Sequence, residues 1–372
     1  MARRSRPKPP DATTGAIPSE ALADAFPALD LPILPPYPPM EARAVTELPA
    51  GEGWLYEPKW DGFRCLAFRN GDRVVLQSKA GQPLTRYFPE VVEALRRLPP
   101  DVFVLDGEIV VPLEGVLSFD DLLQRIHPAP SRVRKLAAET PATLLVFDVL
   151  VDGDASMLIA QPLSERRAAL ERFFARLGAP AGLSLSPATR DRALAERWMH
   201  ELGAAGLDGV MAKRLDEPYR SGDRSGMQKV KRLRTADCVV GGFRYAQKGG
   251  EIGSLLLGLY DDEGRLDHVG FSSSFTREER AALKSVLEPL VEPPGFTGSA
   301  PGGPSRWANE RSTEWQPLRP VLVAEVRYDH FSGDRFRHGT KFVRWRPDKD
   351  PRQCTFDQVS PKTRAGLRDF GI

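Results

Sequence analysis

The sequence has few cysteines and no long apolar run. Its 372 residues include only three cysteines (Cys65, Cys238 and Cys354), which are far apart and lack the spacing of metal ligands. No apolar stretch approaches the roughly 18 residues that a membrane helix requires. The basic start MARRSRPKPP runs into prolines instead of the apolar stretch of a secretory signal. We therefore expect a cytoplasmic protein without membrane spans, whose cysteines are small core residues in a reducing compartment.

A strong charge of one sign is also absent, because the net charge is only +2. The charges are nevertheless unevenly distributed. From Lys229 to the end there are 24 lysines and arginines against 19 acidic residues, so the part before it is slightly acidic. A basic C-terminal portion is typical of a protein with a polyanionic partner, but an excess this small also fits an ordinary solvated surface.

The length and the local patterns predict two domains after a tail. Residues 1–40 are rich in proline and charge, so we expect an extended tail that lies on the body and forms no helix. Short β-rich runs then alternate with amphipathic helical patterns up to about residue 232. The predicted strands are RVVLQ (73–77), VFVLDGEIVV (102–111) and TLLVFDVLV (143–151). The predicted helices carry Leu163, Leu170, Phe174 and Leu177, and Leu194, Trp198 and Leu202 with Gly203 as a stop.

The segment 233–372 has a different pattern. Its strands are short and are separated by glycines and acidic turns, and one helix interrupts them, with Thr276 and Glu279 as a capping box. This combination predicts a small β-barrel such as an OB-fold. Residues 292–305, rich in glycine and proline, are expected to form a long flexible loop within it. The strands are VVGGFRY (239–245), SLLLGLY (254–260), LDHVGFSSS (266–274) and VLVAEVRY (321–328).

The stretch EPKWDGFR (57–64) is the first local signal with chemical content. A lysine attacks as a nucleophile only in its neutral form, and burial or neighbouring cations favour that form. In such surroundings Lys59 would be a covalent nucleophile. The alternative is a surface lysine beside an Asp-Gly turn, with Arg64 pairing with Asp61.

EPKWDGFR resembles the nucleotidyltransferase signature shared by DNA ligases, RNA ligases and mRNA capping enzymes. The other motifs of that superfamily follow in order up to residue 349, and RWRPDKDPRQCTF (344–356) is most similar to the short bacterial ATP-dependent ligases of the ligase C type. These motifs are LDGEIV (105–110), FDVL (147–150), DGVMAKR (208–214), MQKVK (227–231) and RHGTKFVRWRPDK (337–349).

The resemblance implies both a fold and an activity. The fold would be an α+β adenylation (nucleotidyltransferase) domain of packed antiparallel sheets and helices over 41–232, followed by an OB-fold β-barrel over 233–372. The activity would be that of an ATP-dependent DNA ligase that seals nicks in DNA repair or recombination. AMP would be held on Lys59, passed to a 5′-phosphate and released when a 3′-hydroxyl attacks. The alternatives are an RNA ligase, a capping-type nucleotidyltransferase, or a non-catalytic OB protein that binds nucleic acid.

The resemblance also assigns residues to ATP. Lys229 and Lys231 would bind the α-phosphate, which suits their i, i+2 spacing on one face of a strand; the alternative is an exposed basic edge strand. Glu108 would bind the ribose hydroxyls, and Phe147 would stack on adenine unless it is simply a core residue. Glu57 would meet the adenine through its backbone and side chain.

Asp208 stands where the superfamily usually has glutamate, and it would bind Mg²⁺ or Mn²⁺, because a carboxylate is a hard oxygen ligand. Glu108 and Asp106 are further candidates for the same metal site. The alternative for Asp208 is a turn residue in an Asp-Gly dipeptide.

Nucleic-acid contacts are expected from Arg64, Ser78 and Lys79. Arg64 would contact the ribose or the 5′-phosphate of the nick. In SKAG (78–81) lysine and alanine replace the arginine and asparagine frequent in related ligases. Lys79 would therefore contact a phosphate as a point charge and not as a fork.

In the last motif, Arg346 and Lys349 would swing over ATP and orient its pyrophosphate, with a hinge near 231–234. The alternative is a static barrel surface on which these charges pair with each other. His338 is expected to face solvent. The partners implied are nicked duplex DNA and either a repair primase-polymerase or an end-binding protein, for a protein that acts as a monomer.

Overall fold

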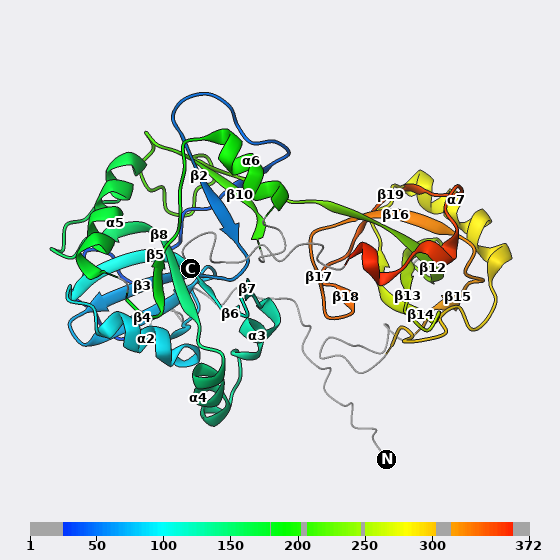
Figure 1. The fold of residues 1–372 in the computed structure, drawn as a ribbon, viewed down its shortest axis with the longest axis horizontal. Coiled ribbons are helices and arrows are strands. Elements are labelled where there is room, and N and C mark those ends of the chain that lie inside the picture. Colours follow the sequence, from blue (N-terminus) through cyan, green and yellow to red (C-terminus); the bar gives the residue numbers. More distant parts are fainter. Residues whose placement is uncertain (1–24, 179, 202–206, 247–249, 303–313, 360–372) are drawn as a thin grey trace, which may run out of the picture.

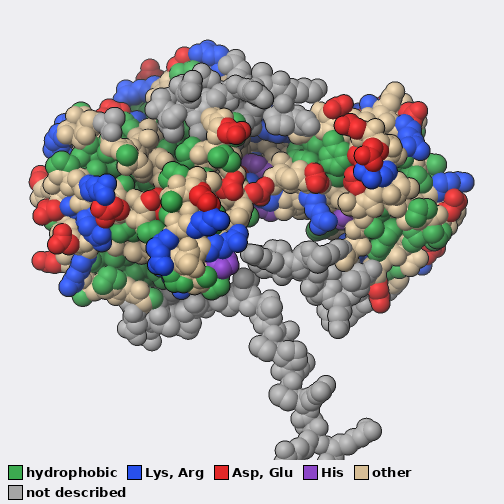
Figure 2. Space-filling model, turned by 60° about the horizontal axis from the view of Figure 1, so that its bottom comes forward, with side chains coloured by type: hydrophobic (Ala, Val, Ile, Leu, Met, Phe, Trp, Pro, Cys, Tyr) green, Lys and Arg blue, Asp and Glu red, His purple; other side chains and the backbone are tan. Residues whose placement is uncertain are grey.

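The computed structural model describes residues 25–178, 180–201, 207–246, 250–302 and 314–359. Figure 1 shows two parts, which we call the N-terminal body (25–231) and the C-terminal barrel (234–359). On the face drawn in Figure 2, cationic and anionic side chains are interspersed over both parts, in keeping with the small net charge. No helix among the described residues is long and apolar enough to cross a membrane.

The N-terminal body contains a five-stranded sheet in the order β4-β3-β5-β8-β9. Helices α2 (Pro89–Arg96) and α5 (Leu163–Leu177) contribute Leu95, Leu170 and Phe173 to the core on one side of this sheet. The three predicted strands and the first predicted helix are confirmed. The strands are β3 (Phe63–Asn70), β4 (Arg73–Ser78), β5 (Val102–Val110), β8 (Thr143–Val151) and β9 (Leu183–Leu185).

A second sheet of four strands, in the order β1-β11-β10-β2, packs against the first. Tyr56 and Val210 of this sheet share a core cluster with Leu145 of β8 and Trp198 of α6 (Arg192–Glu201). The predicted stop of that helix at Gly203 lies outside the described residues. The expectation of antiparallel pairing holds except for the edge pairs β1–β11 and β8–β9, which are parallel. The strands are β1 (Arg43–Val45), β2 (Trp54–Trp60), β10 (Leu207–Arg214) and β11 (Met227–Lys231).

Residues 25–40 contain no helix or strand and lie along the N-terminal body. The side chain of Gln77 hydrogen-bonds the backbone N–H and carbonyl of Tyr37, and the backbone N–H of Met40 donates to the Tyr219 hydroxyl at 3.0 Å. Ile33 and Met40 are buried. The remaining elements of the body are α3 (Phe119–Gln124), α4 (Pro130–Glu139), and the short pair β6 (Pro112–Leu113) and β7 (Val116–Leu117).

The C-terminal barrel is built on a curved sheet in the order β14-β13-β12-β16-β19, with β15 (Gln316–Pro317) beside β12. A bridge between Ser272 and Thr340 joins the end of β14 to the residue before β19, so the two outer strands meet again. A contact through one bridge fits the partly open barrel of an OB-fold. The strands are β12 (Arg234–Tyr245), β13 (Ile252–Tyr260), β14 (Leu266–Ser272), β16 (Val323–Tyr328) and β19 (Lys341–Trp345).

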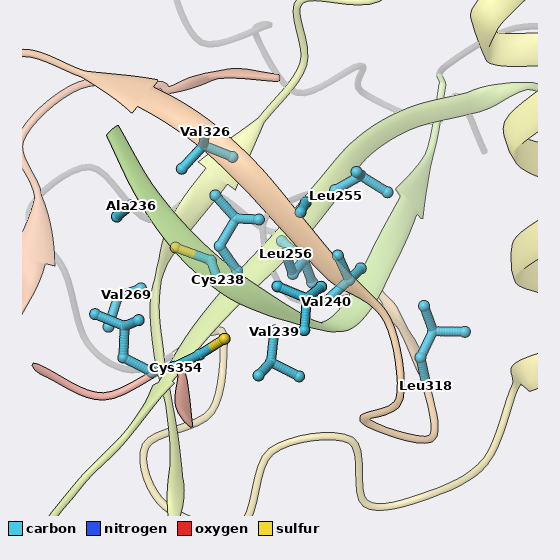
Figure 3. Packing of buried hydrophobic residues seen from close by; sticks show 14 of the residues in the cluster. Ala236, Cys238, Val239, Val240, Leu255, Leu256, Val269, Leu318, Val326 and Cys354 are labelled. Carbon is cyan, nitrogen blue, oxygen red and sulfur yellow. The ribbon is translucent and has the colours of Figure 1, made fainter. Parts of the chain in front are cut away.

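Helix α7 (Arg277–Leu287) follows β14, and its predicted capping box between Thr276 and Glu279 is present. The core beneath it includes Val239, Leu256 and Val326 (Figure 3). Within the predicted loop 292–305, residues 292–302 form no helix or strand, but Phe296 is buried in this core. At least this part of the loop is therefore packed against the barrel.

All three cysteines are buried and unpaired, as predicted. Figure 3 shows Cys238 and Cys354 within the barrel core, and Cys65 lies in the core of the body. Burial raises the pKa of the Cys354 thiol to about 12, so this side chain is a neutral core group.

Candidate active site

A pocket in the N-terminal body lies between its two sheets and the segment 40–42. Strands β2, β5, β8, β10 and β11 all contribute side chains to its wall. Seven of the predicted site residues line it, from segments up to 172 residues apart in the sequence: Glu57, Lys59, Arg64, Lys79, Glu108, Phe147 and Lys229.

Lys59 lies near the end of β2, opposite Gly209 of β10. Its Nζ donates a hydrogen bond to Asp208 Oδ2, and the two side chains are 19% and 4% exposed. Asp208 is also approached by His330 Nε2 at 2.7 Å and by Lys231 Nζ at 3.8 Å. Burial alone would raise the pKa of Asp208, but the hydrogen bonds from His330 and Lys59 outweigh it and hold the pKa well below its usual range.

Two Asp-Gly dipeptides owe their glycines to close backbone contacts. A Cβ at Gly62 would lie 2.3 Å from the Ile109 carbonyl oxygen, and one at Gly209, where φ is +145°, would lie 2.0 Å from the Val230 carbonyl oxygen. Asp208 itself lies within strand β10 (Leu207–Arg214), at a register shift between Leu207 and Gly209. Its interpretation as a turn residue is therefore wrong.

Arg64 pairs with Asp106 and not with Asp61. Its Nε and Nη2 lie 2.5 and 2.6 Å from the two carboxylate oxygens of Asp106, which also accepts a hydrogen bond from the Tyr219 hydroxyl at 2.7 Å. Asp106 is fully buried, and these partners take three of the roughly four acceptor sites of its carboxylate. Asp106 could share a metal ion with Asp208 only if some of these partners moved, and its role there stays a prediction.

Asp61, between β2 and β3, instead faces the barrel. Arg337 donates to both of its carboxylate oxygens, at 3.0 and 2.6 Å, and His330 Nδ1 is 3.8 Å away. Burial raises the pKa of Asp61, although His330 and Arg337 act in the opposite direction. The guanidinium of Arg337 also lies over the Phe119 ring at 3.8 Å.

One end of the pocket is built around an aromatic ring and a buried carboxylate. The ring of Phe147 has the Arg64 guanidinium at 4.6 Å and the Lys213 ammonium at 4.3 Å from its centroid. Lys213 Nζ also pairs with Glu57 Oε2 at 2.6 Å. The other oxygen, Glu57 Oε1, is buried and has no hydrogen-bond partner among the described residues. Lys213 was not predicted as a site residue, although it lies within the DGVMAKR motif.

Glu108 also lines the pocket, on the strand that carries Asp106. Burial raises the pKa of Glu108 to about 7, although the cations Arg64 and Lys59 oppose this shift. This carboxyl group can therefore exchange a proton near neutral pH.

The other end of the pocket is cationic. Lys229 of β11 lines it, and its pKa is lowered by burial and by the neighbouring cations Lys59, Lys79 and Lys231. Strand β11 lies between β1 and β10, so the alternative of an exposed basic edge strand is wrong. Lys231 does not line this pocket; it pairs with Asp329 of the barrel at 3.2 Å.

Of the predicted nucleic-acid residues, Lys79 lies at the pocket rim and pairs with Glu41 at 3.0 Å. The hydrogen bond from Lys79 lowers the pKa of Glu41. The hydroxyl of Ser78 accepts a hydrogen bond from the backbone N–H of Gln82 at 3.0 Å, which stabilises the turn after β4.

Arg346 and Lys349 are not brought to the pocket. Arg346 Nη1 lies 2.9 and 3.0 Å from the carboxylate oxygens of Asp237, and its other nitrogens pair with Asp348. The backbone N–H of Lys349 closes a turn onto the Arg346 carbonyl. In this arrangement the motif is a surface of the barrel on which charges pair, as the alternative interpretation had it.

The barrel reaches the site through the segment 329–338, which includes the hairpin β17 (Phe331–Ser332) and β18 (Arg335–Phe336) and lies on the side of the barrel that faces the N-terminal body in Figure 1. We call the pairs Lys231–Asp329, Asp208–His330 and Asp61–Arg337 the interdomain contact. Arg337 opens the last predicted motif, whereas no sequence signal singled out His330. His338 is exposed, as predicted.

No group of three or more metal-ligating side chains occurs among the described residues. The charged carboxylate of Asp208 is chemically suited to a divalent cation. Its oxygens are, however, shared by Lys59, His330 and Lys231. A metal ion could use Asp208 only after some of these partners had moved.

Comparisons with known proteins agree with this geometry. The family model described as "ATP dependent DNA ligase domain" matches residues 39–231, and the one described as "ATP dependent DNA ligase C terminal region" matches residues 248–349. DNA ligase C2 of Mycolicibacterium smegmatis is 48% identical over 346 residues, which are 89% of this chain and 96% of that protein. DNA ligase C of Mycobacterium tuberculosis is 46% identical, covering 92% and 99% of the two chains.

A solved structure of a Lig E DNA ligase has a similar fold, with a TM-score of 0.51 and 15% identity over 82% of this chain and 99% of that one. The relatives cover most of the chain, and the family model over residues 39–231 includes the pocket around Lys59. The chain therefore belongs to the ATP-dependent DNA ligase family, and its fold is an adenylation domain followed by an OB-fold.

Proposed function

We propose that this ATP-dependent DNA ligase seals nicks through AMP held on Lys59. The amine attacks the α-phosphorus of ATP and pyrophosphate leaves. The 5′-phosphate of the nick then takes the AMP, and the 3′-hydroxyl attacks that phosphate and releases AMP. The observation that carries the proposal is that Lys59 lines one pocket together with the buried carboxylate of Glu57, the ring of Phe147 and the cation Lys229.

The first end of the pocket suits adenosine. Glu57 Oε1, which lacks a hydrogen-bond partner among the described residues, would accept a hydrogen bond from the 6-amino group of adenine. Phe147 would stack on the base, and Glu108 would accept hydrogen bonds from the ribose hydroxyls. Arg64 is oriented by Asp106 and keeps Nη1 for a ribose or phosphate oxygen.

The cationic end suits the α-phosphate, with Lys229 in the pocket and Lys231 next to it on the same face of β11. Attack requires a free electron pair on Lys59 Nζ, so the proton that Lys59 carries in its ion pair with Asp208 must pass to solvent before the bond to phosphorus forms. A Mg²⁺ or Mn²⁺ ion on Asp208 would neutralise charge on the phosphate and compete with Lys59 for the carboxylate. Asp208 would thus hold the nucleophile before ATP and metal arrive, and release it afterwards.

The domains would span 41–232 and 233–372, with the hinge near 231–234. Arg346 and Lys349 could reach ATP only if the barrel rotated, because they lie outside the pocket in this arrangement. We further propose that the enzyme acts in repair as a cytoplasmic monomer. Lys79 would contact a phosphate of the nicked duplex, and the protein partner would be a repair primase-polymerase or an end-binding protein.

The test is a two-step labelling experiment with the full chain. The protein is incubated with ATP labelled on the α-phosphate, freed of ATP and then mixed with a nicked DNA duplex or with its RNA counterpart. We expect covalent label on the protein that withstands denaturation and disappears as the DNA nick is sealed. Protein that takes no label, after treatment with pyrophosphate to remove prebound AMP, would refute the proposed mechanism. Discharge onto RNA only would favour the RNA-ligase alternative.

Glu108→Gln is expected to change how stability depends on pH. The folded-state pKa of Glu108 is raised from 4.5 to about 7, so the protonated form favours folding and ionisation above pH 7 opposes it. The variant removes this ionisation. Its unfolding free energy should therefore exceed that of the wild type by about 1–2 kcal/mol at pH 8.5, with little difference at pH 5.

Thermal unfolding at both pH values checks this, with the exposed Glu52→Gln as the control. A stability difference that does not change between pH 5 and pH 8.5 would contradict the raised pKa. The same variant should bind ATP more weakly if Glu108 contacts the ribose.

A further inference from the structure

A second hollow, with a volume of about 630 Å³, lies between the N-terminal body and the barrel. We call it the crevice; Figure 2 shows the recess between the two parts, with histidine and cationic side chains near its edges. Its lining contains four cations, Lys229 and Lys231 from β11, Arg327 from β16 and Lys341 from β19, and one carboxylate, Asp329. The crevice is therefore a cationic hollow contributed by both parts of the molecule.

The positions of the two barrel cations, Arg327 and Lys341, reduce the stability of the sheet. Arg327 and Lys341 are directly opposite each other on the antiparallel pair β16–β19, and both are exposed. Like charges in this position destabilise a sheet. Two residues earlier on β16, Glu325 faces Arg344 and pairs with it at 2.7 Å.

Neither Arg327 nor Lys341 has an ion-pair partner among the described residues, whereas many other exposed cations of the chain do. An anion lying between the two side chains would turn their repulsion into joint binding. The arrangement therefore fits a ligand group with negatively charged oxygens.

The crevice adjoins the Lys59 pocket. Lys229 lines both hollows, and Lys231 is within 3.8 Å of Asp208, the partner of Lys59. An anion chain whose first phosphate lay at Lys59 and Lys229 would continue past Lys231 towards the barrel. The residues expected from the family to receive the outer phosphates, Arg346 and Lys349, line neither hollow.

We propose that the crevice binds phosphate groups through Arg327 and Lys341, beyond the α-phosphate position at Lys59. This inference rests on the proposed function of the Lys59 pocket. The shared chemistry is an unesterified or diester phosphate; the source is either the β,γ-phosphates of ATP or the backbone of the nicked strand. The arginine supplies a planar fork of donors and the lysine a point charge.

The test uses the double variant Arg327→Gln/Lys341→Gln of the full chain, with Arg344→Gln, on the same sheet but outside the crevice lining, as the matched control. The first measurement is the rate of self-labelling by α-labelled ATP over a range of ATP concentrations. The second is the single-turnover discharge of purified AMP-bound enzyme onto nicked DNA at several salt concentrations. Thermal melting should show a double variant at least as stable as the wild type, because a repulsion has been removed.

If the crevice takes the outer phosphates of ATP, the KM for ATP in self-labelling should rise about tenfold and discharge should be unchanged. If it takes the nucleic-acid backbone, discharge should slow about tenfold. With nicked DNA below saturation, the slope of the logarithm of the discharge rate against log salt should also flatten by about two, about one unit for each lost phosphate contact. The proposal is overturned if a folded double variant stays within twofold of the wild type in both measurements. Failure of the wild type itself to take label or discharge it would instead refute the proposed function.

Discussion

Replacement of Lys59 by arginine is expected to reduce self-labelling with α-labelled ATP by at least about 10³-fold. Arginine keeps a cation opposite Asp208, so the ion pair that Lys59 makes there can be retained. A guanidinium is always protonated and has no free electron pair with which to attack phosphorus. The loss should therefore arise from the chemistry of the nucleophile and not from the loss of an ion pair.

A nick that already carries AMP on its 5′-phosphate separates the steps. Lys59 is not consumed in the final attack by the 3′-hydroxyl, so Lys59→Arg should still seal this substrate at a measurable rate. Lys135→Arg, on the exposed face of α4, is the matched control and should label like the wild type. Stable label on the arginine variant would show that another residue is the nucleophile.

Asp106→Ala is expected to lower the free energy of unfolding of the N-terminal body by about 3–5 kcal/mol, because it leaves the Arg64 guanidinium without its counter-ion. Asp106 is fully buried, accepts hydrogen bonds from both Nε and Nη2 of Arg64, whose side chain is 18% exposed at the pocket, and accepts one from the Tyr219 hydroxyl. Burial alone would lower the pKa of Arg64, and it is the charge of Asp106 that keeps this pKa above its usual value. Urea unfolding monitored by circular dichroism measures the change.

The double variant Asp106→Leu/Arg64→Met provides the comparison. Removal of both charges leaves no unpaired ion in the interior, so it should recover much of the lost stability. Both variants should lose ATP labelling, because Arg64 also contacts Phe147 in the pocket wall. An Asp106→Ala protein within 1 kcal/mol of the wild type would contradict the view that this pair stabilises the body.

The elements that were predicted correctly are those whose signal lies within a short stretch of sequence. Strands β5 and β8 are continuous apolar runs bounded by turns, and α5 repeats apolar residues at helical spacing, so a short window contains the signal. The convergence of Lys59, Glu108, Phe147 and Lys229 on one pocket was predicted from the resemblance of their motifs. Spacing along the chain alone would not have brought them together.

The incorrect or missing predictions concern partners on other strands. Arg64 was given Asp61 as its alternative partner because the two are neighbours in sequence, but its partner lies on β5, 42 residues later. The pairing of Asp61 with Arg337 joins residues 276 positions apart. Such a contact depends on how the barrel docks, and no local pattern encodes that. His330 was missed for the same reason, because it lies in no motif and acquires its place only through docking.

The motif that contains Arg346 illustrates a different limit. The resemblance of this motif predicted a contact with ATP. A motif match predicts a role at some step of the reaction, but it does not predict where the segment lies in one arrangement of the two parts. In this arrangement Asp237 and Asp348 pair with Arg346 on the barrel surface.

The sharing of one carboxylate has a thermodynamic consequence. Asp208 accepts a hydrogen bond from Lys59 of its own part of the molecule and contacts His330 of the other. Any ligand that binds Asp208 in place of His330 is therefore bound less tightly when the two parts are docked than when they are apart. By reciprocity, the ligand weakens docking by the same free energy. The affinity of Asp208 for a cation and the docking of the two parts are thus coupled, so that a change in one changes the other.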